Sequence, residues 1–383
     1  MSKRTYQQTL SKYTGKNDPN LVWKQTPNYL HCSINSPAQT NTKVKLACFD
    51  LDFTLIKPKS GAKFPRNGSD WMFLMPNVVN KLQDLHDYVI VILSNQSGLL
   101  EPSNTKRKTE FQEKIQQISL HLSMPVHLIA ACCQDIYRKP RTGMWQYLES
   151  LYDIDRENSF FVGDAAGRID NWKPGIKRDF SDTDRKFAIN CGITFHTPEV
   201  FFNDESHAEY KLSGIDPLTL DQGTHSVSKK LNQECVMFIG FPASGKSTFY
   251  QKYFSEYSLV SQDKQGTLQK SLKMLKNYLD NNQSVVLDNL NANKASRKKY
   301  LDEISVPVRC FYFKTDLETS KHLNMFRHLT GGRKVPSVAY NTFLKNFEEP
   351  SLDEGFIEII PIEFKLDLDH IYNHKELFLQ RLI

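Results

Sequence analysis

Two short motifs in this 383-residue chain contain residue types suited to phosphate chemistry, and each directly follows an apolar run. The motifs are Asp50-Leu51-Asp52-Phe53-Thr54 and Gly240-Phe241-Pro242-Ala243-Ser244-Gly245-Lys246-Ser247-Thr248. Paired carboxylates can take a phosphoryl group from an ester, whereas a glycine-rich loop with a lysine can bind a nucleoside triphosphate. A chain that carries both is predicted to remove phosphate at one site and to add it at another.

Further polar residues follow other strand-like runs in the first part of the chain. Apolar runs that predict strands occur at 46–49, 89–93, 126–130 and 160–162. Stretches with helical spacing lie at 111–122 and 143–151, and this alternation favours a parallel sheet covered on both faces. Because ligands of such sheets sit beyond the C-terminal strand ends, we expect one site to collect the polar residues there. They are Asp50, Asp52, Ser94, Asn95, Lys139 and Asp164.

The residue types at this first site suit the hydrolysis of a phosphate ester. One carboxylate can attack phosphorus, and a second can protonate the leaving oxygen and then accept a proton from water. Because two carboxylates repel a phosphate, we expect a divalent cation held by Asp50 and Asp164. Ser94 and Lys139 would hold the remaining phosphate oxygens.

The order of these motifs resembles that of the haloacid-dehalogenase-type phosphatases. The resemblance implies that Asp50 is the nucleophile and Asp52 the general acid–base. It also implies a further acidic residue, for which Asp184 is the candidate. The metal ligands that it implies are Asp50, Asp52 and Asp164. The residues that it implies in phosphate binding or positioning are Thr54, Ser94, Asn95 and Lys139.

The second motif matches the Walker A pattern, G-x-x-x-x-G-K-S, in full. It follows the apolar run 235–239 and precedes a helical stretch at 248–254, which is the context that the motif requires. Backbone N–H groups of such a loop cradle phosphates, while Lys246 would reach the β- and γ-phosphates of ATP and Ser247 would hold Mg²⁺. The predicted ATP-binding residues of the loop are Gly240, Phe241, Pro242, Ala243, Ser244, Gly245, Lys246, Ser247 and Thr248.

Three further residues of the second part are candidates for phosphoryl transfer. Asp263, which follows the apolar run 258–260, is predicted to accept the proton of an attacking hydroxyl, although a helix N-cap would also explain it. Asp288 follows the apolar run 285–287 and could hold Mg²⁺ directly or through water. Arg327 could close over the triphosphate of ATP, or it could be a plain surface residue.

With these motifs in place, the sequence resembles one family, the bifunctional polynucleotide kinase 3'-phosphatases of DNA end repair. In the phosphatase-like part the family stretches are Tyr137-Arg138-Lys139-Pro140, Thr142-Gly143-Met144-Trp145, Phe161-Val162-Gly163-Asp164-Ala165-Ala166-Gly167-Arg168, Asp179-Phe180-Ser181 and Asp184-Arg185. In the kinase-like part they are Gly240-Phe241-Pro242, Gly245-Lys246-Ser247-Thr248, Asp288-Asn289, Asn291, Ser296-Arg297, Phe347-Glu348, Pro350 and Glu354-Gly355-Phe356. The resemblance implies removal of a 3'-phosphate and ATP-dependent phosphorylation of a 5'-hydroxyl on DNA.

The sequence departs from this family at three places. Animal members carry an N-terminal forkhead-associated domain, for which the leader 1–42 is too short. Gln262 stands where the family usually has arginine, and Met325 stands where an arginine often precedes Phe326-Arg327. The last two departures bear on kinase efficiency, and they leave open a phosphatase whose kinase half serves as a DNA-binding platform.

Composition is compatible with a nucleic-acid partner in a reducing compartment, although clusters of charge are usually solvated surface. The net charge is +6, and clusters of basic residues suit a polyanionic partner. The 7 cysteines lack a C-x-x-C pair, so they predict neither a disulfide framework nor a zinc site. Because the sequence has no hydrophobic signal region and no apolar stretch of membrane length, we expect a soluble intracellular protein. The DNA substrate implied by the resemblance places it in the nucleus or also the mitochondrion, and a monomer is the default expectation.

The chain is therefore predicted to be α/β, with two tandem doubly wound parallel-sheet domains. Residues 1–42 are expected to form a flexible leader, 43–220 a haloacid-dehalogenase-like phosphatase and 221–383 a P-loop kinase. The leader contains a partial match to the peptide by which repair proteins bind the sliding clamp, at Gln7, Leu10 and Tyr13. Two other hypotheses stay open: an RNA end-healing enzyme and a non-catalytic tether that recruits ligase.

Overall fold

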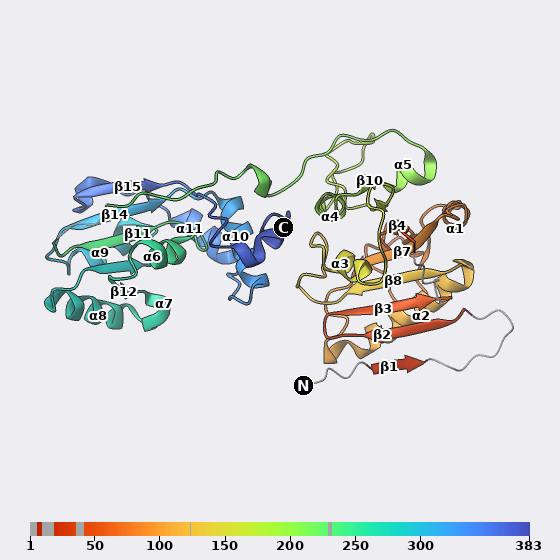
Figure 1. Cartoon of the computed structure of the whole chain (residues 1–383), viewed down its shortest axis with the longest axis horizontal. Coiled ribbons are helices and arrows are strands. Elements are labelled where there is room, and N and C mark those ends of the chain that lie inside the picture. The colour runs from red at the N-terminus through yellow and green to blue at the C-terminus, as the bar shows by residue number, and fades with distance from the viewer. Residues whose placement is uncertain (1–5, 10–18, 36–41, 123, 229–231) are drawn as a thin grey trace. The chain divides into compact units, whose positions relative to one another are not determined.

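The computed structural model of the chain describes residues 6–9, 19–35, 42–122, 124–228 and 232–383 (Figure 1). The chain separates into two compact units, Met1–Ser213 and Gly214–Ile383. Both units are built from a sheet and helices, so the predicted fold class of tandem α/β domains is confirmed. Among the described helices, none is long and apolar enough to cross a membrane.

Strands and helices alternate through most of the first unit. Its strands are β1 (Tyr6–Thr9), β2 (Leu21–Gln25), β3 (Tyr29–Ile34), β4 (Lys45–Phe49), β5 (Ile56–Lys57), β6 (Met72–Phe73), β7 (Tyr88–Asn95), β8 (Val126–Ala131), β9 (Phe160–Val162) and β10 (Thr194–His196). Its α-helices are α1 (Val78–Gln83), α2 (Thr105–Leu122), α3 (Gly143–Glu149), α4 (Thr183–Cys191) and α5 (Pro198–Asn203).

Eight strands of the first unit form one sheet, in the order β1-β2-β3-β8-β7-β4-β9-β10. Five neighbouring strands of this sheet, β8-β7-β4-β9-β10, pair in parallel, which agrees with the predicted alternation of strands and helices. In contrast, β1, β2 and β3 extend the sheet by antiparallel pairing. The sheet is therefore mixed, with a parallel centre that carries the predicted site.

The prediction that residues 1–42 form a flexible leader is wrong for β2 and β3. All six residues of β3 pair with β8, and Trp23, Leu30 and Cys32 are buried in the core. An antiparallel pair needs only a short turn, and the polar residues at 26–28 provide it between two apolar runs. Of the predicted clamp motif, Gln7 lies in β1, whereas Leu10 and Tyr13 lie outside the described residues.

Successive residues of β4 face opposite layers of helices, as the geometry of a strand requires. Phe49 belongs to the same cluster as Phe111 and Ile115 of α2. Cys48 belongs to a second cluster, which includes residues of α3 and α4 such as Trp145 and Phe187. Helices thus cover both faces of the sheet, and the C-terminal ends of the parallel strands are left for the site.

The second unit repeats this layered arrangement with a fully parallel sheet. Its strands are β11 (Cys235–Ile239), β12 (Ser258–Val260), β13 (Val285–Asp288), β14 (Val308–Phe313) and β15 (Glu358–Ile362). Its α-helices are α6 (Lys246–Tyr253), α7 (Gln262–Gln265), α8 (Leu268–Asp280), α9 (Lys294–Leu301), α10 (Leu317–Leu329), α11 (Ser337–Asn346) and α12 (Lys375–Phe378).

The strand order of the second sheet is β12-β13-β11-β14-β15, with every pair parallel. Phe238 of β11 packs in one cluster with Phe249 of α6. Met237, the neighbouring residue, packs in another cluster with Leu275 of α8 and Tyr300 of α9. The strand β11 is therefore central and buried, and the loop that follows it is anchored on both sides.

The second unit begins slightly before the predicted boundary at residue 220. Asp216 forms an ion pair with Arg381, near the C-terminus of the chain. Leu366 N–H donates a 2.7 Å hydrogen bond to the carbonyl of Asp221. These contacts explain why residues 214–220, which were predicted to end the first domain, belong to the second unit.

Candidate active sites

The first site lies where β4, β7 and β9 end side by side in the sheet. Asp50 directly follows β4, and its backbone N–H donates a 2.9 Å hydrogen bond to the carbonyl of Val162 at the end of β9. Asp164 follows β9, and Ser94 lies at the end of β7. The structure thus brings these three sequence-predicted residues to one edge of the sheet.

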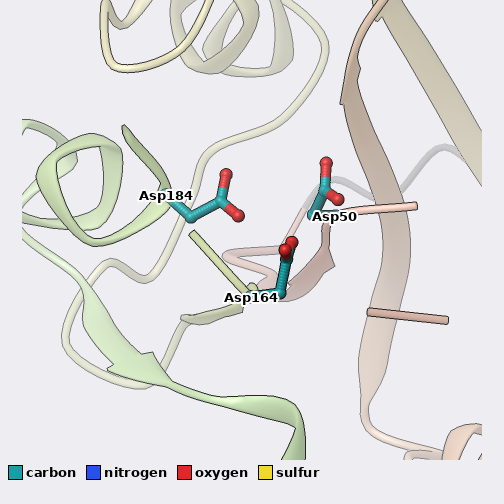
Figure 2. Close-up of side chains that lie close together, drawn as sticks. All are labelled: Asp50, Asp164 and Asp184. Atoms are coloured by element: carbon teal, nitrogen blue, oxygen red, sulfur yellow. The ribbon is translucent and has the colours of Figure 1, made fainter. Parts of the chain in front are cut away.

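Three carboxylates and one lysine form the centre of this site. Oxygen atoms of Asp50, Asp164 and Asp184 all lie within 4.8 Å of one another, and Figure 2 shows the three side chains converging. Lys139 Nζ lies 2.7 Å from Asp50 Oδ1 and 2.8 Å from Asp184 Oδ1. Lys139 and Asp184 are each 2% exposed, so the ion pairs form out of contact with water.

Crowding and burial shift the proton equilibria of these groups. Burial raises the pKa of Asp50 to about 7; Lys139 opposes this shift and Asp184 adds to it. Burial, followed by the charges of Asp184 and Asp50, also raises the pKa of Asp164. Burial alone would lower the pKa of Lys139, but the two carboxylates beside it raise it overall. Three carboxylates against one ammonium leave excess negative charge, which is the environment that a divalent cation neutralises.

Gly163 allows the third carboxylate to approach. A Cβ atom at this position would lie 2.5 Å from Asp184 Oδ2 and 2.7 Å from its Cγ. The same carboxylate accepts a 3.1 Å hydrogen bond from the backbone N–H of Ala165. Only glycine leaves room for Asp184 to lie against the backbone between β9 and Asp164. This contact explains how a residue from the first turn of α4 reaches the site.

Asn95 and Thr54 bond to the backbones of other site residues; positioning was predicted for Thr54, and phosphate binding by Asn95 stays a prediction. The side chain of Asn95 accepts a 2.9 Å hydrogen bond from Lys139 N–H and donates a 3.1 Å bond to the Lys139 carbonyl. Thr54 is fully buried, and its Oγ1 accepts a 3.0 Å hydrogen bond from the backbone N–H of Asp164. The two side chains therefore hold the backbones of Lys139 and Asp164, and both are positioning residues.

The side chain of Asp52 lies outside the cluster of Asp50, Asp164 and Asp184, and its role as a metal ligand stays a prediction. Its Oδ2 accepts a 2.8 Å hydrogen bond from Gln96 Nε2, which lies 2.9 Å from Ser94 Oγ. Its Oδ1 lies 3.6 Å from Lys114 Nζ. Sequence reasoning missed Gln96 and Lys114. The available signals were the place of Gln96 two residues after Ser94 and a lysine on the apolar side of 111–122.

The second site is the loop between β11 and α6. Gly240 has φ 157°, and a Cβ there would lie 2.8 Å from the Cβ of Phe313. Gly245 has φ 96°, in the region that favours glycine, and directly precedes α6. Thr315, which sequence reasoning missed, donates a 2.9 Å hydrogen bond to the carbonyl of Ser244 and holds the loop. The loop thus joins a buried strand to a helix N-terminus, the arrangement that suits phosphate.

Lys246 is buried and bonds to its own loop. Its Nζ donates hydrogen bonds of 3.0 Å to the Gly240 carbonyl and 2.6 Å to the Phe241 carbonyl. Burial lowers the pKa of Lys246 to about 8, although Asp288 and Asp263 act in the opposite direction. The side chain is therefore held across the mouth of the loop, where it can exchange backbone acceptors for phosphate oxygens.

The predicted Mg²⁺ and base residues surround this loop. Ser247 Oγ donates a 2.7 Å hydrogen bond to Asp288 Oδ2, so the two candidate metal-holding groups are in direct contact. Asp263 is exposed on α7, and its neighbour Gln262 donates its backbone N–H to Asn289 Oδ1 at 2.7 Å. The N-cap of α7 is Ser261, so the N-cap alternative for Asp263 is wrong.

A cavity of about 550 Å³ adjoins the loop and includes its residues from Ala243 to Thr248. Arg327 of α10 also lines this cavity, which agrees with its predicted position near a triphosphate. The remaining wall is largely apolar or aromatic, with Tyr253 and Phe326 among its residues. A polar loop at one end and an apolar wall beyond it suit a nucleotide, whose phosphates and base differ in the same way.

Comparison with known families agrees with this division of the chain. Residues 45–202 match the family "Polynucleotide kinase 3 phosphatase", and residues 235–350 match the family "AAA domain". The first match covers the carboxylate site, and the second covers the loop and the strands beside it. The chain is therefore a protein with a phosphatase unit followed by a P-loop kinase unit.

The chain belongs to the family of bifunctional polynucleotide phosphatase/kinases. The bifunctional polynucleotide phosphatase/kinase of Schizosaccharomyces pombe is 38% identical over 343 residues, which cover 85% of this chain and 81% of that protein. A chain of Acanthamoeba polyphaga mimivirus is 33% identical over 407 residues, 95% of each chain. The polynucleotide 3'-phosphatase of Saccharomyces cerevisiae is 32% identical over 212 residues, which cover 40% of this chain and 86% of that protein.

Proposed function

We propose that this protein heals DNA strand breaks, hydrolysing 3'-phosphates in its first unit and phosphorylating 5'-hydroxyls with ATP in its second. The observation that supports this proposal most is that both sites are complete within one chain. Lys139 joins two carboxylates at the first site, and Ser247 contacts Asp288 at the second. Ends that carry a 3'-hydroxyl and a 5'-phosphate after both reactions are suitable for ligation.

At the first site, Asp50 is the proposed nucleophile. Its carboxylate oxygen attacks the phosphorus of the 3'-phosphate, and Asp52 protonates the leaving 3'-oxygen. Water then hydrolyses the aspartyl-phosphate, with Asp52 as the proton acceptor. Lys139 and Ser94 hold the phosphoryl oxygens. Mg²⁺, held by Asp50, Asp164 and Asp184, would neutralise the charge that gathers there.

At the second site, Asp263 is the proposed general base. It accepts the proton of the 5'-hydroxyl as that oxygen attacks the γ-phosphorus of ATP. Lys246 and the backbone N–H groups of the loop hold the phosphates, and Arg327 faces the same cavity. Ser247 and Asp288 would hold Mg²⁺, which would offset the charge of the triphosphate.

Two exposed phenylalanines support a nucleic-acid substrate for the first unit. Phe64 is 72% exposed and Phe180 is 94% exposed, which is unusual for large apolar side chains. Lys63 Nζ lies 4.8 Å from the ring centroid of Phe180 and 5.6 Å from that of Phe64. Aromatic faces beside a cation bind unpaired bases and the phosphates between them. We therefore infer that Phe64, Phe180 and Lys63 contact the DNA strand near its 3' end.

A DNA substrate implies further properties that belong to this proposal. The protein is expected to act in the nucleus, as a monomer, with Mg²⁺ bound at both sites. Sliding-clamp binding through Gln7, Leu10 and Tyr13 would recruit it to DNA, and pull-down with Leu10→Ala and Tyr13→Ala tests that step. Unchanged retention of the double variant on the clamp would contradict it.

Competition between nucleic acids tests the substrate class. Labelled DNA oligonucleotides with a 3'-phosphate or a 5'-hydroxyl are incubated with the protein, Mg²⁺ and ATP, against unlabelled DNA or RNA of the same sequence. We expect DNA to suppress both reactions more strongly than RNA. Stronger suppression by RNA would identify RNA end healing instead, and no reaction at the 5' end would identify the second unit as a binding platform.

A further inference from the structure

Helix α2 carries a lysine on the face that packs against the first sheet. Phe111, Ile115 and Ile118 of α2 are buried in the core, and Lys114 on the same face is only 6% exposed. Burial of an ammonium group is costly unless an opposite charge or hydrogen-bond acceptors satisfy it. The position of Lys114 therefore has to be explained by what its Nζ meets.

The Nζ of Lys114 lies 5.6 Å from the centroid of the Phe111 ring and faces the carboxylate of Asp52. It lies 3.6 Å from Asp52 Oδ1, while Gln96 Nε2 donates a 2.8 Å hydrogen bond to Asp52 Oδ2. Each oxygen of Asp52 thus faces a nitrogen donor, one from α2 and one from the segment after β7. Asp52 itself is only half-buried, with a side chain that is 39% exposed. The contacts with Lys114 and Gln96 therefore restrain a carboxylate that could otherwise rotate toward water.

We propose that Lys114, together with Gln96, is a positioning residue that holds Asp52 as the proton acceptor for hydrolysis of the aspartyl-phosphate. The inference rests on the proposed 3'-phosphatase reaction. Because a nitrogen donor faces each oxygen of Asp52, the two contacts fix the orientation of its carboxylate. Lys114 does not reach the substrate in this account, since it acts through Asp52.

The step that depends on Lys114 is the second half of the reaction. A water oxygen attacks phosphorus, and the bond between phosphorus and the Asp50 oxygen breaks, so Asp50 leaves as a carboxylate. Asp52 takes one proton of the attacking water, and the products are inorganic phosphate and protonated Asp52. That proton is the one Asp52 gives to the next leaving 3'-oxygen. The Lys114 contact, at 3.6 Å, is longer than a hydrogen bond and can be released for that transfer.

A trapped intermediate distinguishes this role from a merely structural one. The full-length protein is mixed with an oligonucleotide that carries a ³²P-labelled 3'-phosphate and is quenched with acid during steady-state turnover. Released phosphate and protein-bound label are measured for the wild type, Lys114→Gln, Lys114→Arg and Lys106→Gln. Lys106 is a matched control, because it lies on the same helix with its side chain 91% exposed.

We expect Lys114→Gln to slow turnover about tenfold, a fraction of what positioned acid–base catalysis contributes, and to raise the protein-bound label. Lys114→Arg should restore both readouts, and Lys106→Gln should match the wild type. Gln96→Ala removes the other contact of Asp52 without changing α2. It should raise the protein-bound label in the same way, so the test does not depend on the stability of one variant.

Two results would overturn the inference. One is a Lys114→Gln variant that turns over at the wild-type rate; the other is slower turnover with no increase in protein-bound label in either the Lys114→Gln or the Gln96→Ala variant. Absence of phosphate release by the wild type would refute the proposed 3'-phosphatase function, and the inference with it. Wild-type release with unchanged variants would refute the inference alone.

Discussion

The two sites differ in how completely their charged groups are buried and paired. At the phosphatase site, Asp50, Lys139 and Asp184 are buried and contact one another. At the kinase site, Ser247 and Asp263 are exposed, and the ammonium group of Lys246 bonds to carbonyls of its own loop. The charged groups of the first site are held by one another, whereas the ammonium group of the second site is held by its own loop.

This difference follows from what each reaction requires. A hydrolase whose nucleophile is a side chain gains from groups fixed before the substrate arrives, because no reorganisation is then needed during reaction. A kinase has to admit a nucleotide and an acceptor strand and to bring them into line. Its binding groups therefore stay accessible, and the nucleotide completes their arrangement. The following changes test whether the two sites really differ in this way.

The largest effect is expected from Lys139→Met. The change removes the buried cation and leaves the carboxylates of Asp50 and Asp184 without their partner. We expect 3'-phosphate release to fall by about a thousandfold or more and the first unit to lose about 3–5 kcal/mol of stability. Phosphate release and urea unfolding are the measurements, and 5'-phosphorylation by the same variant is the control. Retained phosphate release would show that the site does not depend on its buried cation.

A smaller effect is expected from Gly163→Ala. The added methyl group would lie 2.5 Å from Asp184 Oδ2, so the carboxylate has to move away from Asp50 and Asp164. A displacement of about 1 Å can cost roughly a hundredfold in rate, and we expect a loss of that order in phosphate release. Titration with Mg²⁺ should show weaker activation at the same time. A rate near that of the wild type would mean that the cluster tolerates movement and is not preorganised.

Nucleotide binding should stabilise the second unit and leave the first unchanged. A non-hydrolysable ATP analogue with Mg²⁺, at a hundred times its dissociation constant, is expected to add about 2.7 kcal/mol of stability. Hydrogen exchange of peptides should slow over the loop 240–248 and α10, with no change around Asp50. Lys246→Ala should abolish the protection. Slower exchange across both units would contradict the view that only the kinase site is assembled by its ligand.

The last prediction concerns pH. Burial lowers the pKa of His31 to about 3 and that of His127 to about 4, both below the ordinary value near 6.5. At a pH between the lowered pKa values and 6.5, the histidines of the unfolded chain bind protons that those of the folded chain do not. The free energy of unfolding is therefore highest above pH 6.5 and decreases as the pH falls toward 4. At pH 5 the loss is about 2 kcal/mol for each histidine.

Urea unfolding of the first unit at pH 7.5 and pH 5 measures this loss. His31→Gln, which removes one of the two groups, should reduce the difference between the two pH values. A pH-independent unfolding free energy would show that the two histidines are not held neutral in the fold. The pair is hydrogen-bonded, with His31 Nε2 and His127 Nδ1 2.9 Å apart, on the neighbouring strands β3 and β8.

The sequence predicted those parts of the sites that depend on strand ends and loop glycines. Asp50, Ser94 and Asp164 follow apolar runs, and parallel strands bring their C-terminal ends to one edge of a sheet. The Walker A loop is likewise local, since its glycines, lysine and serine are consecutive. The succession of residues along the chain was therefore enough to predict where these residues lie.

Residues that act through tertiary contacts were less predictable. Lys114 lies on a helix whose period indicates packing only, and nothing in the sequence shows that its Nζ reaches Asp52. The bonds of Asn95 to Lys139 were not predicted, because they join two segments that are far apart in the chain. The hairpin of β2 and β3 was missed because its two apolar runs are short and lie within a stretch that is otherwise polar.

The central claim is that one chain processes both ends of a break through two separate sites. The direct measurement uses a gapped DNA duplex with a 3'-phosphate and a 5'-hydroxyl, incubated with Mg²⁺ and ATP and with wild type, Asp50→Asn or Lys246→Ala. We predict that Asp50→Asn loses only 3'-phosphate release and that Lys246→Ala loses only 5'-phosphorylation. Failure of the wild type at either end, or loss of both activities from one substitution, would contradict the account.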